Sequence, residues 1–317
     1  MTLPKNAPVC VIDCGSNTTR VLIRSADAVL LRTTSVTRLS EGADTAGIVS
    51  KEATERVLTV LEKTRVECET LGVTKGVLVS TSAIRDAANA GEFLERAAAA
   101  CGLKAVVISG YQEAAYSFDA ATMNVCRANA LVIDIGGSST ELAKENPVVG
   151  LDTASLQLGS VRLAERALGT SPVSLESALA GVGMITDALL AGIERSPWLR
   201  SDLSTLNVVT IGGTAECLAS LVNATKEGLT GPTPDPFSIN LMKIATPQVR
   251  SVKTTLTSLA PAAIKDLPGM IPGRETTITA GVLILDALLQ HFSIKEVTFS
   301  ANSLVDAIAQ DLLTNPN

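Results

Sequence analysis

Two stretches of this chain share one pattern: "VCVIDCGSNTTRVLI" (Val9–Ile23) and "ALVIDIGGSSTELA" (Ala130–Ala143). Each contains Val-Ile-Asp, one further residue, a glycine and small polar residues, which is typical of a buried strand, a tight turn and a second strand. The two aspartates, Asp13 and Asp134, lie 134 − 13 = 121 residues apart. A repeat of this length is too long for a solenoid and indicates a duplicated domain.

The rest of the chain alternates strand-like and helix-like runs. Residues 51–72 have apolar side chains at helical spacing and end at a glycine, whereas 76–80 and 105–109 are short runs rich in valine. This alternation predicts an α/β fold. We expect two domains that face each other across a cleft, with a last helix that packs back on the first domain. Their predicted ranges are 1–126 for the N-terminal domain, 127–300 for the C-terminal domain and about 301–317 for the helix.

Composition excludes several classes of protein. Hydrophobic residues make up 46% of the 317 residues and the formal net charge is −6, which favours a globular protein that binds neither nucleic acid nor a membrane surface. We expect no membrane span, because no run approaches the roughly 18 apolar residues that one needs. The six cysteines lack metal-binding spacing, so we expect buried free thiols and a cytoplasmic location.

The repeated turns have a chemical use. A tight turn of glycine and serine directs several backbone N–H groups into one concavity, which suits phosphate oxygens. A third glycine turn, "TIGGTAE" (210–216), follows another strand-like run. The residues expected to bind phosphate are Gly15, Ser16, Asn17, Thr18, Gly136, Gly137, Ser138, Ser139, Gly212, Gly213 and Thr214.

Charged residues near these turns complete the prediction. Arg85 lies in the first turn of a helix after a strand, where a guanidinium can fork onto phosphate oxygens. Asp134 and Glu141 can reach one pocket through a strand–turn–strand, and such oxygen ligands at a phosphate site predict Mg²⁺ or Mn²⁺. Asp13 is a third candidate metal ligand, and its alternative role is to accept hydrogen bonds from its own turn.

Seven motifs in order along the chain resemble those of the exopolyphosphatase/guanosine pentaphosphate phosphatase (Ppx/GppA) family, in its short two-domain form. They are "DCGSNTTR" (13–20), "STSAIRDA" (80–87), "ISGYQEA" (108–114), "VIDIGGSSTEL" (132–142), "LGSVRL" (158–163), "IGGTAECLA" (211–219) and "PGRETTITAGVLIL" (272–285). The resemblance implies two actin/hexokinase-like (ribonuclease H-like) domains, and homodimers occur in the family.

The resemblance also implies roles for particular residues. Glu113 matches the family's catalytic glutamate, which would act as general base on water, with Asp134 and Glu141 managing metal and water. Arg20 matches a common family position, and Arg274 is a possible outer contact to a long polyanion. Two residues depart from the family pattern: Gln112 replaces the first of a usual pair of glutamates, and Ser138 replaces a third glycine.

Several functions remain open on the sequence. The leading prediction is an exopolyphosphatase that releases orthophosphate from the end of polyphosphate, and the first alternative is a phosphohydrolase of guanosine pentaphosphate (pppGpp). A kinase or ATPase of the same superfamily and a non-catalytic sensor of polyphosphate or an alarmone are further alternatives. The expected partner is therefore polyphosphate or guanosine pentaphosphate, and not nucleic acid.

Overall fold

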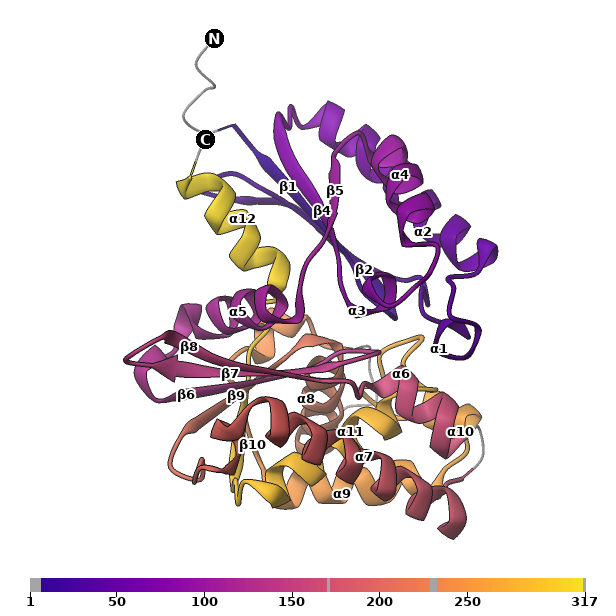
Figure 1. Cartoon of the computed structure of the whole chain (residues 1–317), viewed down its shortest axis with the longest axis vertical. Helices are drawn as coiled ribbons and strands as arrows, with labels where there is room; N and C mark the ends of the chain where they lie inside the picture. Colours follow the sequence, from indigo (N-terminus) through magenta and orange to yellow (C-terminus); the bar gives the residue numbers. More distant parts are fainter. Residues whose placement is uncertain (1–6, 170–171, 229–232, 316–317) are drawn as a thin grey trace. The chain divides into compact units, whose positions relative to one another are not determined.

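The structure is a computed structural model that describes residues 7–169, 172–228 and 233–315. It divides into two compact units (Figure 1). Unit 1 is Met1–Tyr116 with Leu304–Asn317, and unit 2 is Ser117–Ser303. The division therefore falls at 116, inside a helix, rather than at the predicted boundary of 126. The helix ends at Ala121, and its second half makes hydrogen bonds in unit 2.

Unit 1 is built on a five-stranded sheet in the order β3-β2-β1-β4-β5. The first three strands form an antiparallel meander, and β4 and β5 join it in parallel to β1. The strands are β1 (Val9–Cys14), β2 (Thr18–Arg24), β3 (Val29–Val36), β4 (Lys75–Ser80) and β5 (Lys104–Val107). The helices are α1 (Ala43–Ala46), α2 (Lys51–Thr70), α3 (Ser82–Arg85), α4 (Ala90–Cys101), α5 (Gly110–Ala121, shared with unit 2) and α12 (Leu304–Thr314).

Unit 2 repeats this topology with one added strand. Its sheet has the order β10-β11-β9-β6-β7-β8, so the run from β8 to β11 matches the run from β3 to β5. The strands are β6 (Ala130–Ile135), β7 (Thr140–Asn146), β8 (Gly150–Leu156), β9 (Asn207–Ile211), β10 (Lys243–Ala245) and β11 (Glu296–Phe299). The longer helices are α7 (Leu175–Arg195), α8 (Gly212–Glu227), α9 (Thr246–Ser258) and α11 (Ile278–His291), and the short ones are α6 (Ser160–Leu163) and α10 (Pro261–Lys265). The predicted duplication is thus present in the sheets themselves.

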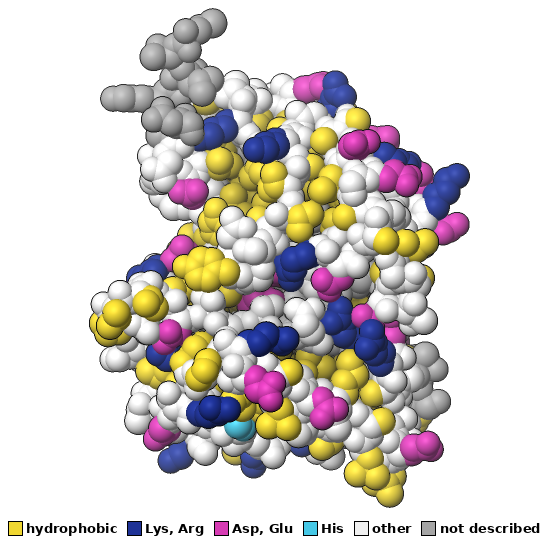
Figure 2. All heavy atoms as spheres, viewed as in Figure 1, with side chains coloured by type: hydrophobic (Ala, Val, Ile, Leu, Met, Phe, Trp, Pro, Cys, Tyr) yellow, Lys and Arg dark blue, Asp and Glu magenta, His cyan; other side chains and the backbone are white. Residues whose placement is uncertain are grey.

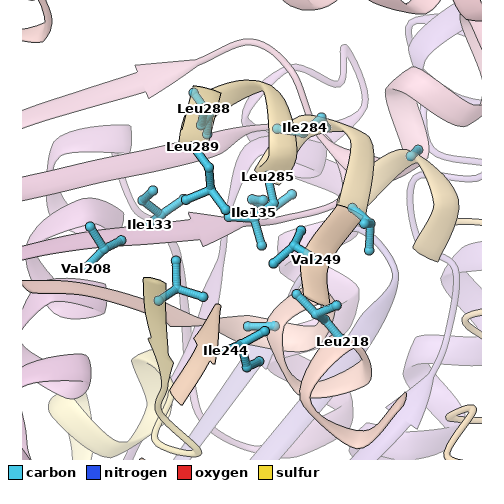
Figure 3. Close-up of a cluster of buried hydrophobic side chains, with 14 of the residues drawn as sticks. Ile133, Ile135, Val208, Leu218, Ile244, Val249, Ile284, Leu285, Leu288 and Leu289 are labelled. Atoms are coloured by element: carbon cyan, nitrogen blue, oxygen red, sulfur yellow. The ribbon is translucent and has the colours of Figure 1, made fainter. Parts of the chain in front are cut away.

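The core of unit 2 explains why the repeated strands are so apolar. Ile133 and Ile135 of β6 belong to one buried cluster with side chains of β9, α8, β10, α9 and α11 (Figure 3). Strands in the middle of a sheet that is covered by helices are buried on both faces, so they read as continuous apolar runs. The equivalent strand β1 of unit 1 is buried in the same way, from Val9 to Ile12. Burial of both central strands fixes where their terminal aspartates stand.

The helix α7 corrects one prediction. Residues Leu175–Arg195 are long and apolar enough to cross a membrane by length and composition alone, so the expectation that no stretch qualifies was wrong. The prediction considered only uninterrupted apolar runs, whereas the apolar residues of α7 are separated by Gly, Ser and single charged residues. In the fold, α7 buries Ile185 and Ile193 against unit 2 but leaves Leu179 and Val182 exposed. Figure 2 shows hydrophobic side chains on the surface where Figure 1 draws α7.

The ion pair between Arg32 and Asp306 fixes α12 to the sheet of unit 1. The guanidinium donates from Nη1 to Oδ2 at 3.1 Å and from Nη2 to Oδ1 at 2.5 Å, and Asp306 is nearly buried. Around it, Val305 and Ile308 pack against Val9, Val11 and Leu22.

We predict that Arg32→Ala lowers the free energy of unfolding by about 2 kcal/mol, because it leaves a buried carboxylate without its cation. This energy is set below that of a fully buried ion pair because the Arg32 side chain is 25% accessible to solvent. Urea unfolding measures the change. The control is Arg65→Ala, which breaks the exposed pair with Glu69 and should cost less than about 0.5 kcal/mol. Equal losses in the two variants would contradict the prediction.

Candidate active site

The first glycine turn connects β1 to β2. It is closed by a hydrogen bond from the N–H of Gly15 to the carbonyl of Thr18, at 3.1 Å. A Cβ at Gly15 would lie 3.2 Å from that carbonyl oxygen, so the tight closure favours glycine. Ser16, Asn17 and Thr18 are all buried.

A second layer of hydrogen bonds holds the first turn from behind. The N–H groups of Thr37 and Arg38 donate to the carbonyl of Asn17, at 3.0 and 2.9 Å. Ser40 donates to the carbonyl of Ser16 with both its N–H (2.9 Å) and its hydroxyl (3.2 Å). These bonds occupy the carbonyl groups of Ser16 and Asn17 and hold the backbone of the turn in one conformation.

The second turn, between β6 and β7, repeats both layers. The N–H of Gly136 donates to the carbonyl of Ser139 at 3.0 Å. Ser160, at the start of α6, donates to the carbonyl of Gly136 with its N–H (2.9 Å) and its hydroxyl (3.2 Å). A Cβ at Gly159 would lie 2.3 Å from the carbonyl of Gly137, so only glycine allows this approach. The motif "LGSVRL" therefore supports the second turn.

The third glycine segment has a different geometry from the prediction. Gly212 and Gly213 do not form a separate turn but begin α8 directly. Gly212 has φ +83°, and a Cβ there would lie 2.4 Å from Oδ1 of Asp134. A Cβ at Gly213 would overlap the guanidinium of Arg274, and Thr214 donates its hydroxyl to the carbonyl of Ile135 at 3.1 Å. These residues make room for Asp134 and Arg274, and their contact with phosphate stays a prediction.

Asp134 and Glu141 lie on one face of the unit 2 sheet. They are directly opposite each other in the antiparallel pairing of β6 with β7, which places their side chains on the same side. Glu141 is buried and accepts a hydrogen bond from the hydroxyl of Ser155 at 2.8 Å. Asp134 accepts one at Oδ2 from the hydroxyl of Ser117 at 2.7 Å. The structure thus brings this predicted pair together.

In unit 1, Arg85 forms an ion pair with Glu113. Its Nη1 donates to Oε2 of Glu113 at 3.3 Å and to the carbonyl of Ile108 at 2.8 Å. Its Nη2 is buried and has no hydrogen-bond partner within the described residues, and the same holds for Nδ2 of Asn17. Two buried N–H donors of this kind indicate that the site takes an acceptor from outside the chain, such as a phosphate oxygen.

The departure at Gln112 has a structural explanation. Ser109 precedes α5, and its hydroxyl accepts a hydrogen bond from the N–H of Gln112 at 3.2 Å. The side-chain Oε1 of Gln112 accepts in return from the N–H of Ser109 at 2.9 Å. This is a capping box, a motif in which Glu and Gln are equivalent. Gln112 therefore stabilises the start of the helix that carries Glu113.

Asp13 and Arg20 are directly opposite each other on β1 and β2. Asp13 lies near the end of the central strand β1 and Arg20 near the start of β2, so both are close to the first turn. Burial, and then the carboxylate of Asp13, raise the pKa of the neighbouring Cys14 thiol well above its ordinary value. The thiol is therefore protonated at neutral pH. All six cysteines are free and all but Cys126 are buried.

The carboxylates offer a partial site for a divalent cation. Among the described residues, no group of three or more His, Cys, Asp or Glu side chains is placed to hold a metal ion. The pair Asp134 and Glu141 remains, and two carboxylates suit Mg²⁺, which usually keeps several waters and completes its shell with substrate phosphates. Participation of Asp13 stays a prediction.

Sequence reasoning missed the supporting residues Ser117, Ser155 and Ser40. Ser117 could have been found as the residue one helical turn after Glu113. Ser155 could not, because its position opposite Glu141 depends on strand register.

Comparison with known proteins identifies the family. The model of the Ppx/GppA phosphatase family matches residues 3–315, so the chain belongs to that family. The predicted enzyme class, a phosphoanhydride hydrolase, is confirmed at the level of the family. Exopolyphosphatase 2 of Mycobacterium tuberculosis is 30% identical over 96% of this chain and 98% of its own length.

A longer relative and the solved structures complete the comparison. The guanosine-5'-triphosphate,3'-diphosphate pyrophosphatase of Pseudoalteromonas translucida is 26% identical over 98% of this chain, which spans 60% of that protein. An exopolyphosphatase from Cytophaga hutchinsonii has the same fold, with a TM-score of 0.84 and 23% identity over 97% of this chain and 98% of its own. The Ppx/GppA protein of Aquifex aeolicus matches with a TM-score of 0.76 and 24% identity, over 98% and 99%.

We predict that Gly212→Ala lowers catalytic activity on the order of 100-fold, because the new Cβ would displace the Asp134 carboxylate. Steady-state kinetics with a phosphoanhydride substrate measure the loss. Gly228→Ala is the matched control: it also has a positive φ, at the other end of α8, but nothing lies within 4 Å of its Cβ. Both variants should lose about 1 kcal/mol of stability from backbone strain. Equal activity of the two would contradict the role given to Gly212.

A second prediction concerns the capping box at α5. Gln112→Glu should keep both stability and activity within a few-fold of wild type, because either side chain completes the box. Gln112→Ala should lower the free energy of unfolding by about 1 kcal/mol. Thermal unfolding and phosphate release measure the two effects. A gain of tenfold or more in turnover for Gln112→Glu would show that this position takes part in the chemistry.

Proposed function

We propose that this protein is an exopolyphosphatase that hydrolyses the terminal phosphoanhydride bond of inorganic polyphosphate and releases orthophosphate. The observation that carries the proposal is two buried N–H donors in unit 1, Nδ2 of Asn17 in the first turn and Nη2 of Arg85 in α3, which have no hydrogen-bond partner in the described part of the chain. Together with amide groups of the turns, they suit the oxygens of a phosphate chain.

Glu113 is the proposed general base. It sits in the first turn of α5 and is nearly buried beside Arg85, which holds its carboxylate in one place. A carboxylate fixed in this way can orient a water molecule for in-line attack and accept its proton. If Arg85 also binds the terminal phosphate, its ion pair with Glu113 fixes the position of the Glu113 carboxylate relative to the phosphorus atom that is attacked.

Asp134 and Glu141 are the proposed ligands of a divalent cation, Mg²⁺ or Mn²⁺. The cation would screen the charge of the substrate and stabilise the charge that develops on its oxygens. In this proposal, the two carboxylates hold it from the sheet of unit 2, and Gly212 leaves space for the Asp134 side chain.

Guanosine pentaphosphate is the alternative substrate. The names of the two relatives, an exopolyphosphatase and a guanosine pentaphosphate pyrophosphatase, support both substrates. We favour polyphosphate because the exopolyphosphatase is the more similar of the two and matches this chain over nearly its whole length. A homodimer and a cytoplasmic location are further proposals, and the six free thiols support a reducing compartment.

The test is phosphate release from long polyphosphate, short polyphosphate, guanosine pentaphosphate and ATP, with Mg²⁺ present. Glu113→Gln should lower kcat on the preferred substrate by at least about 100-fold, because the amide cannot accept the proton. Glu92→Gln is the matched control, since Glu92 is an exposed glutamate in the first turn of α4. Full activity of Glu113→Gln would contradict the mechanism.

The substrate panel separates the alternatives. A preference for polyphosphate supports the proposal, and a preference for guanosine pentaphosphate selects the alternative. Phosphate transferred from ATP to an acceptor, with none released, would identify a kinase. Binding without turnover under any metal would identify a sensor.

A further inference from the structure

Each of the two carboxylates on the unit 2 sheet has a serine hydroxyl as partner. Ser155 of β8 is directly opposite Glu141 in strand register, and Glu141 is directly opposite Asp134. Cross-strand partners place their side chains on the same face. Ser155, Glu141 and Asp134 therefore form a row across three adjacent strands. At the far end of the row, Ser117 reaches Asp134 from α5.

The two hydroxyls act as donors, because an ionised carboxylate can only accept. Ser155 donates to Oε1 of Glu141 at 2.8 Å, and Ser117 donates to Oδ2 of Asp134 at 2.7 Å. Each hydrogen bond engages one oxygen of its carboxylate. Because a carboxylate is planar and rigid, a bond to one oxygen also fixes the direction in which the other oxygen points.

This arrangement matters most for Glu141. A glutamate side chain has three rotatable bonds, and fixing it costs conformational entropy. The hydrogen bond from Ser155 already holds the Glu141 side chain in the folded protein, so less conformational entropy is lost when a cation binds. Hydrogen bonds from outside the coordination shell of a metal typically change its affinity by 10- to 100-fold.

We propose that Ser155 and Ser117 are positioning residues that orient Glu141 and Asp134 to receive a divalent cation. This inference rests on the metal-assisted reaction proposed above. In it, neither serine touches the cation or the substrate. Ser155 fixes the direction of the Glu141 carboxylate from β8, and Ser117 does the same for Asp134 from α5.

Direct cation binding to the whole protein tests the proposal without substrate. Titration with Mn²⁺, followed by electron paramagnetic resonance of the free ion, gives the dissociation constant. Ser155→Ala should weaken binding about tenfold, and Ser117→Ala should also weaken it. Ser155→Thr keeps a hydroxyl on the same strand and should restore binding to within about threefold of wild type.

The matched control is Ser196→Ala. Ser196 also donates a hydroxyl to β8, but to the carbonyl of Thr153 at 3.2 Å, away from Glu141. It should leave the Mn²⁺ dissociation constant unchanged. The thermal unfolding midpoint of each variant shows whether weaker binding comes from a loss of folding. Ser155→Thr should restore Mn²⁺ binding at a midpoint similar to that of Ser155→Ala.

A second readout separates positioning from general damage. With polyphosphate as substrate, Ser155→Ala should raise the Mg²⁺ concentration for half-maximal phosphate release about tenfold, whereas kcat at saturating Mg²⁺ should change less than threefold. Unchanged Mn²⁺ binding in Ser155→Ala would overturn the proposal, and so would an absence of Mn²⁺ binding by the wild type. If the wild type binds Mn²⁺ but hydrolyses no substrate, the proposed function fails while the positioning result still stands.

Discussion

The arrangement of the candidate site depends on one short hydrogen-bonded turn that the chain uses twice. In each copy, a glycine N–H donates to the carbonyl three residues later, Gly15 to Thr18 and Gly136 to Ser139. The turn follows the buried central strand of its sheet, so the aspartate at the strand end has little freedom to move. Both turns are supported from behind by a serine that donates twice to a turn carbonyl. These layers fix the path of the backbone, and with it the direction of the amide groups that would meet phosphate.

The two copies differ in the residue that stands opposite the aspartate, and the proposed function gives each copy a different role on this basis. Opposite Asp13 in unit 1 stands Arg20, whereas opposite Asp134 in unit 2 stands Glu141. A cation beside an aspartate suits the holding of phosphate, and a second carboxylate suits a divalent cation. The sequence predicts this division from the residues that follow each glycine turn, and the strand register gives it a geometric basis.

The sequence predicts most of the fold because the central strands and the longer amphipathic helices carry strong periodic patterns. It fails at β3 and at α7, where an exposed strand and a helix apolar on most sides show neither pattern clearly. In the site, the turns and the carboxylates are visible as motifs. The roles of Gln112, Ser155 and Gly212 are not, because each depends on a contact: a capping box, a cross-strand neighbour, and the space beside Asp134.

The central claim of the proposed function is that each turn, within its own unit, binds phosphate oxygens through its amide groups. Hydrogen–deuterium exchange of the Glu113→Gln variant, with and without short polyphosphate and Mg²⁺, tests it most directly. We predict slower exchange in peptides that cover 15–18 and 136–139, and no change in peptides from α7. Unchanged exchange in both turns, under conditions where the substrate is bound, would contradict the account.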